Sequence, residues 1–129
     1  MESTTIKSSN SSATLTLCKK DGDYFNVIFD SLAVKSNIRV WGYTDCGLLV
    51  DLFKFIAKEW RGWKGKKEWF SIEGEFCISA TSDSLGHILL SLCFNEFNEP
   101  ETWEVKVNIG IDSGQTEKIA KNINSFFND

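Results

Sequence analysis

One short segment of the chain contains the residue types of a hydrolase triad. Asp83, Ser84 and His87 are close in sequence, and His87 is the only histidine of the 129 residues. A triad needs its acid, base and nucleophile to converge from separate segments beside an oxyanion hole. These residues share one tight turn instead. We therefore expect a structural cross-strand pair of Asp83 and His87, and we predict no catalytic residue and no enzymatic activity.

Signatures of cofactor and metal sites are also missing from the sequence. It contains no P-loop, no strand-linked G-x-G-x-x-G and no H-E-x-x-H. Its four cysteines are scattered singly, without a C-x-x-C, and one histidine is available to join them: Cys18, Cys46, Cys77 and Cys93. We expect half-buried thiols, no metal and no cofactor. Cys46 is the candidate for a reactive thiol, because the first turn of a predicted helix lowers a thiol pKa.

An acidic cluster late in the chain is the first candidate binding surface. The net charge of −4 argues against a domain that binds nucleic acid over its whole surface. The carboxylates instead favour a protein partner, and the predicted partner-binding residues are Glu96, Glu99, Glu101 and Glu104. The alternative for this cluster, and for the basic one that follows, is a solvated face without a partner.

A basic and aromatic cluster in the middle of the chain is the second candidate surface. Exposed aromatic rings beside cations are what a protein uses to stack and hold single-stranded nucleic acid. The alternative nucleic-acid patch comprises Arg61, Trp63, Lys64, Lys66, Lys67 and Trp69. The same residue types can instead seal a corner between helix and sheet, with Arg61 stacked between Trp60 and Trp63.

A strongly patterned helix must position the basic cluster. Apolar residues recur on one face of a 3.6-residue period, and Thr44 or Asp45 can cap the first turn. Gly62 and Gly65 can adopt the left-handed conformations that end a helix. We expect the helix to run from Asp45 to Trp60 and to be the central helix of the fold.

Alternation of apolar and polar residues predicts the strands. The predicted strands lie at about 13–18, 25–29, 37–43, 68–72, 75–81, 87–94 and 102–111. A second helix is expected over 114–127, with Ser113 as its cap. The strands and helices follow the order βββ-α-ββββ-α.

Two hairpins are predicted to close with three-residue loops whose last residue is a glycine at positive φ. The first loop, ending at Gly22, would pair Leu17 with Phe25. The second, Ser84-Leu85-Gly86, would pair Ile78 with Leu92.

These elements define the expected fold class. Tight hairpins make an antiparallel sheet, so we predict an α+β protein with one curved sheet of about seven strands on the central helix, and a C-terminal helix. One domain is expected over residues 1–129, with 1–12 a flexible polar tail. No apolar run reaches the about 20 residues needed to cross a bilayer, and the N-terminus lacks the apolar core of a signal peptide. A soluble, cytoplasmic protein is expected.

The block Trp60-Arg61-Gly62-Trp63 and the later turn Gly86-His87 resemble the marks of a bacterial domain family of unknown function. Further matching positions are Gly65, Trp69, Ser71 and Glu73-Gly74, so the resemblance covers most of the chain. It implies a bacterial origin and a single domain, and it implies no catalytic activity.

The predicted function is therefore that of a non-catalytic protein-binding module. Most concretely, we expect a cytoplasmic immunity protein that neutralises a secreted bacterial toxin by occluding it, since its carboxylates complement a basic toxin domain. The alternative is a single-stranded nucleic-acid binder. Neither a membrane nor a metal is expected among the partners.

Overall fold

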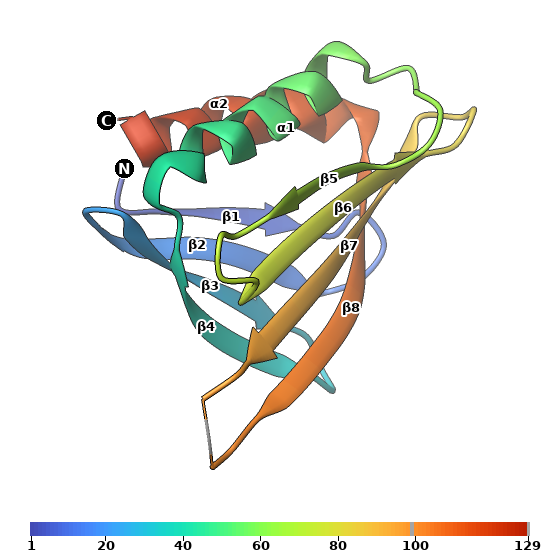
Figure 1. Cartoon of the computed structure of the whole chain (residues 1–129). Coiled ribbons are helices and arrows are strands. Elements are labelled where there is room, and N and C mark those ends of the chain that lie inside the picture. The colour runs from blue at the N-terminus through green and yellow to red at the C-terminus, as the bar shows by residue number, and fades with distance from the viewer. Residues whose placement is uncertain (99, 129) are drawn as a thin grey trace.

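The computed structural model of the protein describes residues 1–98 and 100–128. Its class is α+β, as predicted, with two helices and two antiparallel sheets of four strands each (Figure 1). The prediction of one curved sheet of about seven strands is wrong. Alternation reveals which face of a strand is buried, but it does not reveal which strands are hydrogen-bonded to one another.

The first sheet contains the first four strands in chain order. They are β1 (Ser3–Lys7), β2 (Thr14–Asp21), β3 (Tyr24–Asp30) and β4 (Lys35–Trp41). Strand β1 lies within the segment 1–12 that was expected to be a flexible tail. Its pairing with β2 and the burial of Thr4 and Ile6 correct that expectation.

The second sheet contains the last four strands, again in chain order. They are β5 (Lys67–Phe70), β6 (Phe76–Ser82), β7 (His87–Glu96) and β8 (Trp103–Asp112). Strands β7 and β8 have ten residues each, and their hairpin reaches the end of the molecule opposite the helices (Figure 1).

The helices α1 (Cys46–Lys58) and α2 (Thr116–Asn128) pack side by side across one end of the two sheets (Figure 1). Helix α1 is thus one of a pair and not a central helix inside a curved sheet. A 3₁₀ turn precedes each helix, at Tyr43–Asp45 and Ser113–Gln115. These turns replace the predicted caps: the side chain of Asp45 makes no capping bond to α1, and the Asp112 amide donates to Gln115 Oε1 at 2.8 Å.

The two halves of the chain have the same order of elements. Each consists of four antiparallel strands, a 3₁₀ turn and a helix of thirteen residues. Helix α1 contacts β5, and α2 contacts β1, so each helix packs against the first strand of the other half. One core therefore joins both halves, and its largest fully buried side chains include Phe25, Phe76, Phe94 and Phe126.

The register of the second hairpin is the one predicted. Ile78 faces Leu92, and Gly86 has a φ of +79° at the end of the loop. The rows of apolar residues on β6 and β7 therefore meet on the buried face of the sheet.

The predicted register of the first hairpin is wrong by two residues. Leu17 faces Val27 and not Phe25, because the ladder is irregular between Cys18 and Asp21. Lys19 has a φ of +53° there. Positive φ is uncommon for a residue other than glycine, so a lysine at this position does not predict it. Since side chains alternate with a period of two, a shift of two residues keeps the apolar residues on the buried face.

Candidate functional site

The Trp-Arg-Gly-Trp block and the Gly-His turn pack against each other and form what we call the corner, residues 60–63 and 83–87. Gly62 has a φ of +124°, and a Cβ atom on it would lie 3.1 Å from the carbonyl oxygen of Asp83. A Cβ atom on Gly86 would lie 3.6 Å from the carbonyl oxygen of Trp60. Two segments far apart in sequence thus meet through their backbones, and Gly62 permits the approach.

Asp83 organises the turn of the corner. Its Oδ1 accepts hydrogen bonds from the amides of Leu85 at 2.8 Å and His87 at 3.0 Å, and its Oδ2 lies 2.9 Å from His87 Nδ1. These hydrogen bonds lower the pKa of Asp83, and the bond from the His87 amide has the largest effect. The predicted cross-strand pair is confirmed. Within residues 1–98 and 100–128 no hydroxyl hydrogen-bonds to His87, so the described chain assembles no triad here.

The two tryptophans of the predicted nucleic-acid patch are used by the fold. Trp69 is 4% exposed, and its Nε1 donates to the carbonyl oxygen of Asp45 at 3.0 Å. Trp63 is half-buried and packs edge-on against Phe55, with ring centroids 5.4 Å apart. The core covers the ring of Trp69, so a base cannot stack on it. The alternative prediction, in which Trp69 is part of a nucleic-acid patch, is therefore wrong for this residue.

The cations of the basic patch are on the surface. Arg61 stacks over the exposed ring of Trp60, with its guanidinium carbon 4.8 Å from the centroid. It is not held between Trp60 and Trp63, because Trp63 turns toward Phe55.

The three lysines of the patch are also exposed. Lys66 lies 3.5 Å from a carboxylate oxygen of Glu68, and Lys67 lies over the Phe55 ring at 5.1 Å. Lys64 is exposed beside them. The patch thus remains cationic, but neither of its own two indoles is exposed, and the exposed indole next to it is that of Trp60.

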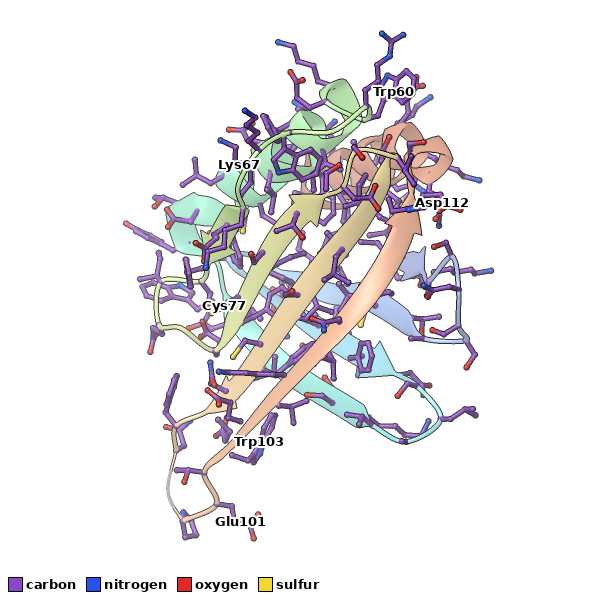
Figure 2. All side chains as sticks on the ribbon, turned by 90° about the vertical axis from the view of Figure 1, so that its right-hand side faces the viewer. Trp60, Lys67, Cys77, Glu101, Trp103 and Asp112 are labelled. Carbon is purple, nitrogen blue, oxygen red and sulfur yellow. The ribbon has the colours of Figure 1, made fainter. Side chains whose placement is uncertain are left out.

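The end of the β7–β8 hairpin forms an acidic tip, which we define as Glu96, Phe97, Glu101, Trp103 and Glu104. Glu96 faces Trp103 across the hairpin. Phe97 is 62% exposed and Trp103 is 39% exposed. Glu101 and Trp103 lie at the far end of the molecule from Trp60 (Figure 2).

Three of the four predicted partner-binding carboxylates belong to the tip. Glu101 and Glu104 are exposed, and Glu96 is partly exposed. Glu104 lies 3.7 Å from Lys106 on the same strand, an exposed pair that contributes little. The fourth residue, Glu99, lies outside the described residues.

Asn95 anchors the base of the tip, a role that sequence reasoning missed. Asn95 is buried. Its backbone amide donates a hydrogen bond to the carbonyl oxygen of Glu75 at 2.9 Å, and its side-chain Nδ2 donates one to the carbonyl oxygen of Gly74 at 2.9 Å. The Phe97 ring lies beside Gly74 as well. The tip is therefore fixed to the turn between β5 and β6.

Cys46 is not the activated thiol that its place at a helix start suggested. Burial raises its pKa, and the nearby carboxylate of Asp23 raises it further. Desolvation disfavours the thiolate more than the helix start favours it. Among the described residues no three histidine, cysteine or acidic side chains gather as a metal site, and no helix is long and apolar enough to span a membrane.

The fold and its two surfaces define a small α+β protein with a basic patch next to the corner and an acidic tip. The chain belongs to DUF6228, a family of unknown function that matches residues 6–129. This confirms that it is a member of an uncharacterised domain family. No curated protein and no solved structure matches the chain.

Proposed function

We propose that the protein is a non-catalytic protein-binding module whose partner contacts the acidic tip. The observation that carries the proposal is the composition of the tip: the end of one long hairpin presents the exposed rings of Phe97 and Trp103 and the carboxylates of Glu96, Glu101 and Glu104, with Glu96 directly opposite Trp103. Aromatic residues are enriched in protein interfaces, and surrounding charge steers a partner of opposite sign.

The concrete form of the proposal is a cytoplasmic bacterial immunity protein that occludes a secreted toxin. A toxin that acts on nucleic acid needs a basic cleft, and a projecting acidic hairpin has the shape and the charge to enter one. The net charge of −4 supports the same assignment.

Co-expression with the product of the neighbouring gene tests this function. We expect that product to inhibit growth when expressed alone, and this protein to form a complex with it and restore growth. Absence of both complex and protection would remove the immunity assignment.

A pair of charge reversals tests the surface. Glu101→Lys should weaken the complex about tenfold or more, because it sets like charges against each other in the interface. The control is Asp51→Lys, an equal charge change at an exposed position of α1. Equal weakening by both variants would show that net charge, and not the tip, governs binding.

The alternative function, binding of single-stranded nucleic acid, is supported by the exposed pair of Trp60 and Arg61 beside Lys64, Lys66 and Lys67. Burial of Trp69 and packing of Trp63 weaken it. Titration with an oligothymidine at low salt should quench tryptophan fluorescence if this function holds, and unchanged fluorescence would eliminate it.

A further inference from the structure

Two of the four free cysteines face each other across neighbouring strands. Cys77 of β6 is paired in register with Cys93 of β7, and both are half-buried. Figure 2 shows Cys77 on the second sheet, between the corner and the tip. Phe70 faces Cys77 from β5, and Lys106 faces Cys93 from β8.

The backbone spacing at this pair suits a disulfide. The Asn95 amide donates to the Glu75 carbonyl, so that opposed pair is hydrogen-bonded, and Cys77 with Cys93 occupies the equivalent position two residues along. Opposed residues at hydrogen-bonded positions have Cα atoms about 5.5 Å apart. Disulfides need Cα atoms about 4.4–6.8 Å apart, so the Cα spacing expected for this pair lies within the range that a disulfide requires.

The two thiols also interact in their reduced state. Burial above all, and then the neighbouring Cys93 thiol and the carboxylates of Glu68 and Glu75, together raise the pKa of Cys77 to about 11. Cys93 Sγ lies 3.6 Å from Asn95 Oδ1 and 3.9 Å from Glu104 Oε2. At neutral pH the Cys77 thiol is therefore almost entirely protonated.

We propose that Cys77 and Cys93 form a reversible cross-strand disulfide by exchange with a low-molecular-weight disulfide of the glutathione type. One cysteine thiolate attacks the small disulfide, giving a mixed disulfide and releasing one small thiolate. The thiolate of the other cysteine then attacks the protein sulfur of the mixed disulfide and releases the second small thiolate. The protein dithiol is oxidised by two electrons, the small disulfide is reduced, and the two cysteine protons pass to the two released thiols.

The bond would fasten β6 to β7 at the base of the acidic tip. Cys93 is two residues before Asn95, which anchors the tip to the turn before β6. Oxidation would thus hold the tip in place by a covalent bond as well as by the hydrogen bonds of Asn95. This inference does not depend on what the tip binds.

Incubation of the reduced full-length chain with oxidised glutathione at pH 8 tests the proposal. After alkylation of free thiols and proteolysis, we expect a disulfide-linked peptide pair that contains Cys77 and Cys93, with Cys18 and Cys46 alkylated. The linked form should melt on the order of 10 °C above the reduced form, because the bond closes a loop of intermediate length. A wild-type chain with both thiols free, or with glutathione on each separately, would overturn the proposal.

Single-cysteine variants separate the two steps of the exchange. Cys77→Ser should stop at the mixed disulfide and retain one glutathione on Cys93, because the resolving thiol is absent. The control is the double variant Cys18→Ser with Cys46→Ser, which should form the cross-strand bond as the wild type does. Loss of the bond in that control would mean that the oxidised pair is another one, and the assignment to Cys77 and Cys93 would be wrong.

Discussion

The corner and the acidic tip both combine tryptophan with charge, but the fold uses these groups differently. In the corner, Asp83 accepts three hydrogen bonds from its own turn, and Trp63 packs against Phe55. Outside the corner, Trp69 of β5 is buried in the core. At the tip, Phe97 and Trp103 are exposed beside carboxylates. Residue types alone therefore do not identify a binding surface: what matters is which groups the fold leaves without an internal role.

Replacement of tryptophan by alanine should show the largest difference between a buried indole and the exposed indole of the tip. Trp69→Ala should lower the free energy of unfolding by about 3–5 kcal/mol, because it opens a cavity in the core and leaves the Asp45 carbonyl without its donor. Trp103→Ala should change it by about 0.5 kcal/mol or less, as for an ordinary surface substitution. Denaturant unfolding of both variants measures the difference, and comparable losses of unfolding free energy would contradict the contrast between a tryptophan that the fold buries and the exposed tryptophan of the tip.

Alanine at a corner glycine should have the next largest effect. Gly62→Ala should cost about 1–3 kcal/mol, because its φ is strained for a side chain and the Asp83 carbonyl is already close. Gly65→Ala is the matched control: it has a φ of +75° with no atom near the new Cβ, so it should cost about 1 kcal/mol. If both variants lose the same unfolding free energy, the contact between Gly62 and the Asp83 carbonyl contributes nothing to stability.

Lowering the pH should test whether the Asp83 carboxylate stabilises the folded protein. Its pKa is lowered in the folded state, so its carboxylate stabilises the protein above the unfolded pKa of about 3.9, and that contribution is lost as the pH falls through the folded value. Asp83→Asn removes the titrating group. The wild type should therefore lose melting temperature more steeply than the variant as the pH falls below about 4. Parallel curves would show that the turn does not depend on the carboxylate.

The smallest effect is expected at Arg61. A structural role between the Trp60 and Trp63 rings was one predicted alternative for Arg61 and would make it costly to replace, but its guanidinium stacks on Trp60 alone at the surface. Arg61→Lys should cost about 0.5 kcal/mol, since one exposed cation–π contact is weakened and no buried hydrogen bond is lost. A loss well above 1 kcal/mol in a thermal or denaturant unfolding experiment would show that the guanidinium has a further structural partner.

The parts of the fold that the sequence predicted are those with uninterrupted alternation. The β6–β7 register followed from apolar residues at every second position and a glycine at the end of the loop. The β2–β3 register failed because Lys19 adopts a left-handed conformation without a glycine to signal it. Strand β1 was missed because Ile6 is the single apolar residue among serines and threonines.

The candidate site was predictable where it depends on exposure and not where it depends on packing. Carboxylates near a proline-containing turn are expected at a surface, so the acidic tip followed from sequence. The burial of Trp69 and the anchoring role of Asn95 result from contacts between distant segments. No local pattern distinguishes a buried tryptophan from an exposed one, or an anchoring asparagine from a loop residue.

The affinity of the co-expressed partner for two matched truncations tests the central claim most directly. Trp60 of the corner and Trp103 of the tip are exposed to a similar extent, 44% and 39%, so either can be replaced by alanine with little effect on folding. Calorimetric titration should show about tenfold weaker binding for Trp103→Ala and a change within about twofold for Trp60→Ala. The opposite result, with binding lost at Trp60 and retained at Trp103, would place the interface at the corner and contradict this account.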